Sequence, residues 1–250
     1  MKTLSLRLLT LGALFTHVLT GGAMAAEPNE TTASQTLTLK VEPERDLVYR
    51  KGPHEVIVQV EIDGERRRDS AKRSPMNLSV SLDRSGSMEG AKIEKARQAA
   101  AMLVDRLDAD DTFSMVIYDD RTELLVPPQR VGSRSDREAI KERIEQIRPG
   151  GSTALYAGVK LSAEQVRKFQ KGDRVNRVIL VSDGIANVGP SKTSDLSRLG
   201  RELRQEGIGV TTIGVGDDYN EDLMTALAES SHGNYYYVRD AEKLPEIIAE

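Results

Sequence analysis

The chain has 250 residues, a formal net charge of -4, 38% apolar residues and neither cysteine nor tryptophan. This length predicts one or two domains, and the apolar fraction is large enough for a hydrophobic core. The mildly acidic charge argues against a nucleic-acid-binding protein, and the lack of cysteine excludes disulfides, thiol catalysis and cysteine-ligated zinc.

Residues 1–25 have the pattern of an export signal peptide. Lys2 and Arg7 give a positively charged start, Leu8–Thr20 is apolar, and Ala23-Met24-Ala25 offers small residues around a cleavage point. The apolar run is short for a helix that crosses a bilayer, so an uncleaved membrane anchor is the less favoured alternative. We expect an exported protein, periplasmic or extracellular, with no stable membrane insertion after signal cleavage.

Residues 26–76 are expected to form a polar lead-in and accessory β-strands. Thr36–Val41 and Glu55–Ile62 alternate apolar and polar residues with the period of a strand. An isolated pair of strands is only marginally stable, so we expect these two to pair and to lean on the domain that follows. The basic stretch Glu65–Ser74 is interpreted as a solvated connector rather than a patch for an anionic partner.

From Asn77 onwards, strands and helices alternate along the chain. The predicted strands span residues 78–82, 112–118, 122–126, 177–182, 209–215 and 234–238. The predicted helices span residues 92–107, 135–147, 155–169, 195–205, 220–230 and 242–250. This order predicts an α/β domain over residues 77–250, with a doubly wound, mostly parallel sheet covered by helices on both faces, as in Rossmann-like folds.

Two prolines and the end of the chain refine this prediction. Pro127 and Pro128 are expected to stop the strand that begins at Thr122, because proline has no N–H for a strand ladder. The last predicted helix is still running at Glu250, so we expect the natural chain to continue beyond this residue.

A short polar motif follows the first strand of this domain. Asp83, Ser85 and Ser87 form a D-x-S-x-S pattern, and alternate residues of an extended or looped backbone can face the same side. One carboxylate and two hydroxyls would then converge. Such hard oxygen donors suit Mg²⁺, Mn²⁺ or Ca²⁺ and suit zinc or copper poorly.

The motif resembles the metal-ion-dependent adhesion site (MIDAS) of the von Willebrand factor type A family. That site also uses a downstream threonine and a downstream aspartate, which Thr153 in Gly-Gly-Ser-Thr-Ala-Leu and Asp183 in Val-Ser-Asp-Gly supply here. The resemblance covers residues 77–250. It is nearest to a bacterial exported group related to calcium-activated chloride channel proteins.

The resemblance implies a ligand set and a function. Asp83, Ser85 and Ser87 would bind the metal directly, Thr153 directly or through water, and Asp183 would lie just outside these ligands. Mg²⁺ is expected, with Mn²⁺ or Ca²⁺ as alternatives, because hydroxyl-rich sites with few carboxylates bind Ca²⁺ weakly. A partner protein's Asp or Glu side chain would complete the coordination, which makes the domain an adhesion-type protein-binding module.

Two other functions are alternatives to this one. A Mg²⁺-dependent hydrolase of the aspartyl-nucleophile type would need a second acid two residues after the first, where this chain has Ser85, and no phosphate-binding loop or G-x-S-x-G motif is present. We therefore expect no enzyme activity. The second alternative is a scaffold that binds partners away from the metal. Asp119-Asp120 is interpreted as a hairpin turn, and a role of Asp217-Asp218 in shaping the ligand surface is the less favoured alternative for that pair. Gly233 is expected to cap the helix that ends before it, so His232 is interpreted as a helix-end residue rather than a general base.

Overall fold

The computed structural model describes residues 37–43, 58–64, 73–184, 186–216 and 220–244. The chain divides into two compact units, Met1–Lys72 and Arg73–Glu250. The expected signal peptide, the polar lead-in, most of the basic connector, Asp217-Asp218 and the end of the last helix lie outside the described residues.

The first unit contains one antiparallel strand pair. Strand β1 (Leu37–Pro43) pairs with β2 (Val58–Gly64), with Leu39 opposite Ile62 and Val41 opposite Val60. This is the pairing that the alternating pattern predicts.

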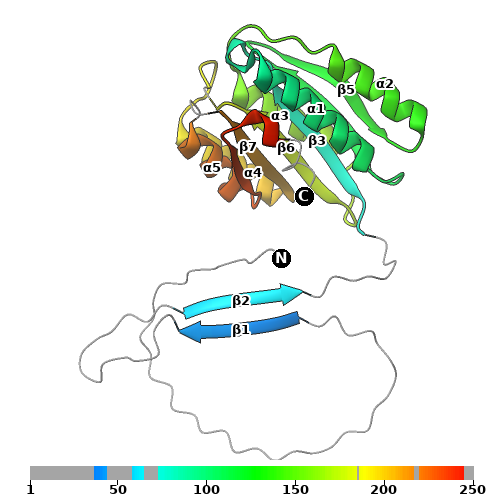
Figure 1. The fold of residues 1–250 in the computed structure, drawn as a ribbon. Coiled ribbons are helices and arrows are strands. Elements are labelled where there is room, and N and C mark those ends of the chain that lie inside the picture. Colours follow the sequence, from blue (N-terminus) through cyan, green and yellow to red (C-terminus); the bar gives the residue numbers. More distant parts are fainter. Residues whose placement is uncertain (1–36, 44–57, 65–72, 185, 217–219, 245–250) are drawn as a thin grey trace, which may run out of the picture. The chain divides into compact units, whose positions relative to one another are not determined.

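The second unit is built on a six-stranded sheet (Figure 1). Its strands, in chain order, are β3 (Met76–Asp83), β4 (Thr112–Tyr118), β5 (Thr122–Arg130), β6 (Val175–Ser182), β7 (Ile208–Val215) and β8 (Tyr235–Val238). In space they follow the order β5-β4-β3-β6-β7-β8, and all neighbours are parallel except β4 and β5. The predicted α/β fold with a mostly parallel sheet is confirmed.

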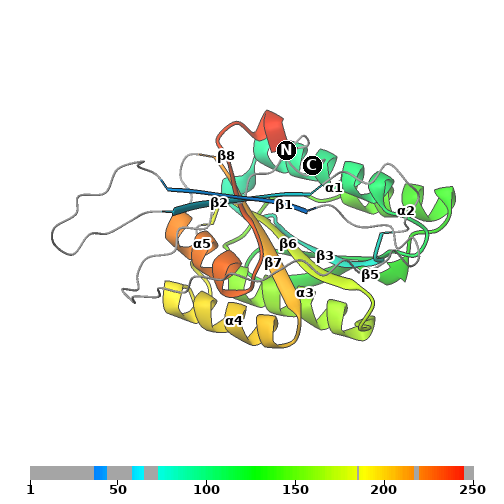
Figure 2. The same ribbon diagram turned by 90° about the horizontal axis from the view of Figure 1, so that it is seen from below.

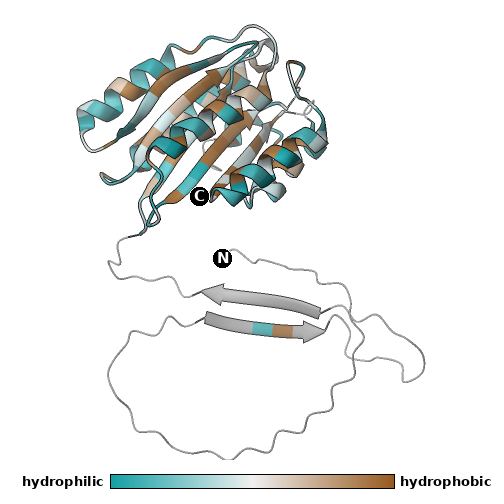
Figure 3. Ribbon diagram, turned by 180° about the vertical axis from the view of Figure 1, so that it is seen from behind, coloured by the Kyte–Doolittle hydropathy of each residue, from teal (hydrophilic) through white to brown (hydrophobic). Residues whose placement is uncertain are grey.

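Helices cover both faces of this sheet. They are α1 (Ala91–Arg106), α2 (Arg134–Glu145), α3 (Leu155–Lys168), α4 (Thr193–Gln205) and α5 (Glu221–Ser230), with short 3₁₀ turns η1 (Gly86–Met88) and η2 (Ala241–Lys243). Figure 2 shows α1 and α2 on one face and α3, α4 and α5 on the other. The helices turn apolar stripes towards the sheet and polar residues outwards (Figure 3).

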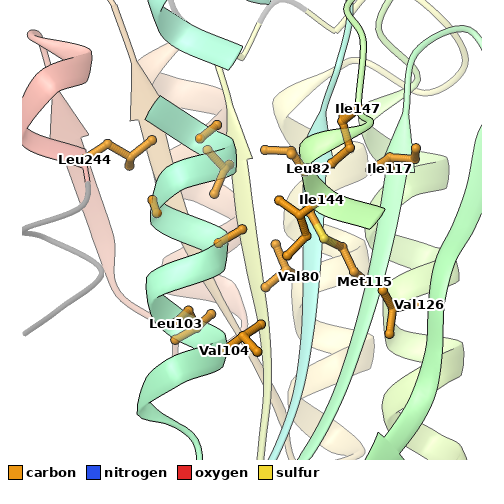
Figure 4. Packing of buried hydrophobic residues seen from close by; sticks show 14 of the residues in the cluster. Val80, Leu82, Leu103, Val104, Met115, Ile117, Val126, Ile144, Ile147 and Leu244 are labelled. Carbon is orange, nitrogen blue, oxygen red and sulfur yellow. The ribbon is translucent and has the colours of Figure 1, made fainter. Parts of the chain in front are cut away.

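Each face has its own hydrophobic core. On the side of α1 and α2, Val80 and Leu82 of β3 pack with Met115 and Ile117 of β4 and with helix residues such as Ile144 (Figure 4). On the other side, α3, α4 and α5 pack on the alternate residues of β6 and β7. The strand residues that face α3 from β3 are the small, fully buried Ser79 and Ser81, which leave room for this helix.

The chain leaves the centre of the sheet in two directions. From β3 it crosses through α1 to β4 on one side, and from β6 it crosses through α4 to β7 on the other. The loops after β3 and β6 therefore separate at the same edge of the sheet. In doubly wound folds, this switch point is where ligands bind.

Three sequence expectations need correction. Strand β5 does not end at residue 126 but continues through Pro127 and Pro128 to Arg130. It can do so because β5 is an edge strand, and because a bulge separates the Met115–Val126 pair from the Phe113–Gln129 pair.

The second correction concerns the start of a helix. Helix α2 begins at Arg134 rather than Ser135, with a reciprocal capping box between Ser133 and Asp136.

The third correction concerns the end of α5. The sequence predicts that Gly233 caps this helix, but the left-handed residue is His232, with φ of 58°. Gly233 is needed for a different reason: a Cβ there would lie 1.8 Å from the Val210 carbonyl oxygen. The glycine permits a close backbone approach between the helix end and β7.

Within the part of the chain that the structure describes, no helix combines the length and the apolar character that crossing a membrane requires.

The contact between Gly158 and Tyr118 yields a stability prediction. A Cβ at Gly158 of α3 would lie 2.4 Å from Cδ1 of the fully buried Tyr118 ring. We expect Gly158→Ala to lower the free energy of unfolding by about 1–3 kcal/mol through overpacking, although alanine favours helices. Urea unfolding would measure the change. Gly132→Ala is the matched control, because a Cβ at Gly132 meets nothing within 4 Å. Equal stability of the two variants would contradict the prediction.

Candidate metal centre

Asp83 is the last residue of β3, and its carboxylate is fully buried at the switch point. Its Oδ1 accepts a hydrogen bond from the Ser85 backbone N at 2.8 Å, and its Oδ2 accepts one from the Ser182 Oγ at 2.5 Å. Ser182 is the last residue of the neighbouring β6 and also accepts the Gly184 N at 2.9 Å. The ends of β3 and β6 are thus joined through one carboxylate.

The two serines of the D-x-S-x-S motif lie in the turn after Asp83. Ser85 Oγ and Ser87 Oγ are 3.1 Å apart, and Ser85 is buried whereas Ser87 is exposed. The fully buried Met88 side chain anchors the turn in the core. The hydroxyl pair therefore leads from the buried carboxylate to the surface.

Thr153 lies in the loop before α3, and this loop contacts the D-x-S-x-S turn. The Gly86 N donates to the Gly151 O at 3.0 Å, and the Gly150 N donates to the Arg84 O at 2.8 Å. Gly151 has φ of +74°, and a Cβ there would lie 2.5 Å from Asp120 Oδ1, so this position requires glycine. The buried Thr153 is held beside the turn by backbone hydrogen bonds.

The same threonine is tied to the loop after β6. Its backbone N donates to Asn187 Oδ1 at 2.8 Å, and its carbonyl oxygen accepts the backbone N–H groups of Asn187 and Val188, each at 3.2 Å. Three loops therefore meet at one rim of the sheet, and all five predicted site residues lie on these loops or the strand ends that lead into them.

Asp183 follows β6 and is also fully buried. Its Oδ2 lies 3.2 Å from the Nζ of Lys92, in the first turn of α1. Its Oδ1 has no hydrogen-bond partner among the described residues. A buried carboxylate oxygen without a partner is energetically costly, which suits a position that a cation completes.

Burial changes the acidity of the groups around Asp83. It raises the pKa of Asp83 to about 6; hydrogen bonds from Ser182 and Ser85 oppose this rise, and the charge of Asp183 adds to it. Burial, together with the charge of Asp83, raises the pKa of the nearby Tyr118 phenol well above its ordinary value. The two buried acids of the site therefore have too little positive charge near them to balance their own.

The donor set fits a hard divalent cation. Within the described residues there is no cluster of three or more His, Asp or Glu side chains with a metal-binding arrangement, so any ion here would depend on serine and threonine hydroxyls. Asp83 with its two serines, the adjacent Thr153 loop and Asp183 supply such oxygen donors.

Sequence reasoning missed two supports of this site. One is Lys92, which follows the motif in the next helix and pairs with Asp183. The other is Asp119, predicted only as a turn residue: its Oδ1 accepts the Arg121 N at 2.9 Å in the turn, but its Oδ2 also accepts Arg84 Nε at 2.9 Å. Asp119 thereby braces the D-x-S-x-S loop as well as the hairpin.

Comparison with known proteins places this arrangement among relatives. A model of the von Willebrand factor type A domain matches residues 77–250. The uncharacterized protein sll0103 of Synechocystis sp. is 34% identical over 172 residues, which cover 69% of this chain and 40% of that protein. This chain spans 31% of YfbK of Escherichia coli, at 29% identity over 184 residues, so it covers less than half the length of these curated relatives.

Solved structures share the fold at lower identity. A von Willebrand factor type A protein from Catenulispora acidiphila has a TM-score of 0.66 and 18% identity, over 86% of this chain and 48% of that one. Proximal thread matrix protein 1 from the mussel byssus, in a structure with a zinc-occupied MIDAS motif, has a TM-score of 0.58 and 20% identity, over 71% of this chain and 47% of that one.

The raised pKa of Asp83 predicts pH-dependent metal affinity. Because the pKa of Asp83 is about 6, only roughly a tenth of this group is ionised at pH 5. A metal must displace that proton, so we expect Mg²⁺ to bind roughly tenfold more weakly at pH 5 than at pH 7.5 in calorimetric titrations. Ser182→Ala removes a hydrogen bond that lowers the pKa, so the loss of affinity should begin at a higher pH in this variant.

The raised pKa of Asp83 also determines how the stability of the fold depends on pH. The folded pKa lies above the unfolded value, so ionised Asp83 costs stability at neutral pH, and this cost disappears as the pH falls through 6 towards 4. Equal Mg²⁺ affinity at pH 5 and at pH 7.5 would contradict the predicted pH dependence of metal binding.

Lys92 and a bound metal ion would both lie near the Asp183 carboxylate, so removing the lysine should change how strongly the metal stabilises the fold. Lys92→Met keeps the apolar stem, which lies against Gly216, but removes the charge beside Asp183. We expect the variant to lose about 1–3 kcal/mol of stability in EDTA and to gain more stability than the wild type from saturating MgCl₂. Thermal unfolding with and without Mg²⁺ measures both effects.

Lys95→Met is the matched control for this experiment. Lys95 lies on the same helix and pairs with Glu242 Oε2 at 2.6 Å, away from the metal centre. If the Lys92 and Lys95 variants respond alike to Mg²⁺, the proposed role of Lys92 is wrong.

Proposed function

The chain belongs to the von Willebrand factor type A family, and on this premise we propose that residues 77–250 form a metal-dependent protein-binding module, not an enzyme. The metal would be held by Asp83, Ser85, Ser87 and Thr153, with Asp183 beside them. The observation that carries the proposal is the pair of fully buried carboxylates at the switch point, one of which has an oxygen without a partner among the described residues.

Charge explains why a cation belongs at this place. Asp83 and Asp183 both lie out of contact with water, and Lys92 is the cation that contacts Asp183 directly. Burying two negative charges against one positive charge leaves one of them uncompensated, which costs several kcal/mol unless a further cation binds or a proton is taken up. Burial raises the pKa of Asp83 to about 6, and the charge of Asp183 adds to this rise.

Mg²⁺ is the proposed metal, with Mn²⁺ or Ca²⁺ as alternatives. The donors are one carboxylate and three hydroxyls, and Ca²⁺ generally takes more oxygen ligands and more carboxylates than this site offers. The mussel matrix protein with zinc in its MIDAS motif supports the general point that this fold can hold a divalent ion.

The proposed partner is a protein that presents an Asp or Glu side chain. Only one of the residues that would bind the ion directly is charged, so a bound divalent cation supplies a positive, incompletely coordinated position that can accept a carboxylate oxygen. Ser87 is exposed while Ser85 and Asp83 are buried, which gives such a side chain an approach from the surface. The backbone contacts between the three loops would hold the donors in place.

Export belongs to the same proposal. Residues 1–25 would direct the chain out of the cytoplasm and be cleaved, and residues 26–76 would precede the binding domain as a polar lead-in with accessory strands. The kinship with the exported group related to calcium-activated chloride channel proteins stays a prediction. The chain spans less than half the length of the curated relatives named above, so the activities of those proteins would involve more than this domain.

A peptide-binding experiment tests the proposal. Immobilised peptides that each carry one Glu, and matched peptides with Gln instead, are probed with the chain in MgCl₂ and in EDTA. We expect binding that requires both Mg²⁺ and Glu, that is lost in Asp83→Ala, and that is weakened about 10- to 100-fold in Thr153→Ala, because a hydroxyl donor is removed.

Ser152→Ala is the matched control, since Ser152 is an exposed neighbour of Thr153 in the same loop. Circular dichroism of each variant would check that the fold survives. Peptide binding that persists in EDTA, or that is equal in Thr153→Ala and Ser152→Ala, would favour the alternative of a scaffold that binds partners away from the metal.

A further inference from the structure

A second polar site lies at the opposite edge of the sheet from the metal centre. The amino ends of β6 and β7 and the carboxyl end of α5 surround a cavity of about 270 Å³. Its lining includes Arg174, Arg177, Arg204 and His232, and none of the described residues that line it is acidic. The three arginines give this lining a positive charge, in a chain whose net charge is -4.

Neutral acceptors orient two of these arginines. Arg174 Nη1 donates to the Asp110 carbonyl oxygen at 2.9 Å and to Thr112 Oγ1 at 3.2 Å, and Arg177 Nη1 donates to the His232 carbonyl oxygen at 3.0 Å. Within the described residues, neither guanidinium forms an ion pair with a carboxylate. The contacts position the two groups but leave their charges uncompensated.

The backbone around Arg177 is shaped to receive its side chain. A Cβ at Gly209 would lie 1.9 Å from Arg177 Nη1, so the missing side chain of this glycine leaves the space that the guanidinium occupies at the start of β7. His232, whose carbonyl oxygen accepts from Arg177, has a left-handed backbone with φ of 58°, which is uncommon for a residue other than glycine. The space at Gly209 and the His232 carbonyl oxygen together position the Arg177 guanidinium.

Arg204 completes the cluster from the last turn of α4. Its side chain is exposed and makes no hydrogen bond or ion pair within the range that the structure covers. Glu206, two residues away, is occupied: Arg167 donates to its carboxylate through Nε at 2.5 Å and through Nη2 at 2.9 Å. Of the two acids that lie two residues from Arg204 in the sequence, Glu206 is thus committed to a different arginine.

Helix ends alone do not account for this cluster. Arg204 and His232 lie at the carboxyl ends of α4 and α5, where positive charge is favoured by the helix dipole. However, each helix end carries only about half a charge, and Arg174 precedes a strand rather than ending a helix. Positive charge remains after the dipoles are taken into account.

We propose that this cavity binds a tetrahedral dianion: a phosphate or sulfate, free or carried as a phosphoryl or sulfuryl group on a larger ligand. Guanidinium groups match such anions in charge and in geometry, because each presents several N–H donors in one plane. Arg177 and Arg174 would supply pre-oriented donors, and Arg204 would close over the anion from the helix. This binding is independent of the metal centre.

Calorimetric titration of inorganic phosphate into the full chain tests this site. The buffer contains EDTA, so that phosphate cannot bind through a metal, and low salt, so that weak binding is not screened. We expect saturable binding that is at least tenfold weaker in Arg204→Gln and unchanged in Arg201→Gln. Arg201 is the matched control, because it is an exposed arginine of α4 that does not line the cavity.

Parallel titrations with sulfate, acetate and O-phosphoserine separate the possible ligands. Sulfate should bind like phosphate, and acetate should bind much more weakly. O-phosphoserine binding at least as tightly as phosphate indicates a group carried on a larger ligand, and weaker binding indicates the free anion. No phosphate binding, equal loss in Arg204→Gln and Arg201→Gln, or acetate binding as tight as phosphate would overturn the proposal.

Discussion

The centre of this protein is organised by the burial of two carboxylates beside each other, at the ends of two parallel strands. Asp83 and Asp183 lie at the point where the chain turns to opposite sides of the sheet, and both are out of contact with water. The hydrogen bonds and the ion pair around them partly compensate for that burial. Ser182 and the Ser85 backbone donate to Asp83, and Lys92 contacts Asp183 from α1. Burial still raises the pKa of Asp83 to about 6. A divalent cation is the simplest further compensation.

The rest of the fold keeps these groups in register. β3 pairs with β6 residue by residue, so the end of one strand fixes the end of the other. Gly158 lets α3 approach the Tyr118 ring, whose hydroxyl lies near the same carboxylates, and Gly151 lets the Thr153 loop pass close to the β4–β5 turn. Rigid strands thus carry the charged groups, while backbone hydrogen bonds between loops place the hydroxyls.

Local patterns in the sequence predicted much of this arrangement. The alternation of Leu78, Val80 and Leu82 with serines indicated β3, and the D-x-S-x-S spacing indicated a polar turn at its end, because both depend on neighbouring residues. Lys92 pairs with a residue far along the chain, and no local pattern announces such a partner. The arginine-lined cavity is harder still, since Arg174, Arg204 and His232 each look like ordinary surface residues until the sheet brings them together. For Pro127 the local pattern gave a wrong prediction. Proline usually ends a strand, but it is tolerated here because β5 is a bulged edge strand.

That bulged edge has a consequence for self-association. A free strand edge exposes N–H and C=O groups that can recruit a strand from another molecule. On β5, Pro127 and Pro128 have no N–H groups to donate and the bulge distorts the ladder, while β8 at the other edge is only four residues long. Neither side of the sheet offers a long, regular template for polymerisation. For a chain without disulfides, such resistance to fibril growth would limit edge-to-edge aggregation when concentration rises or folding is slow.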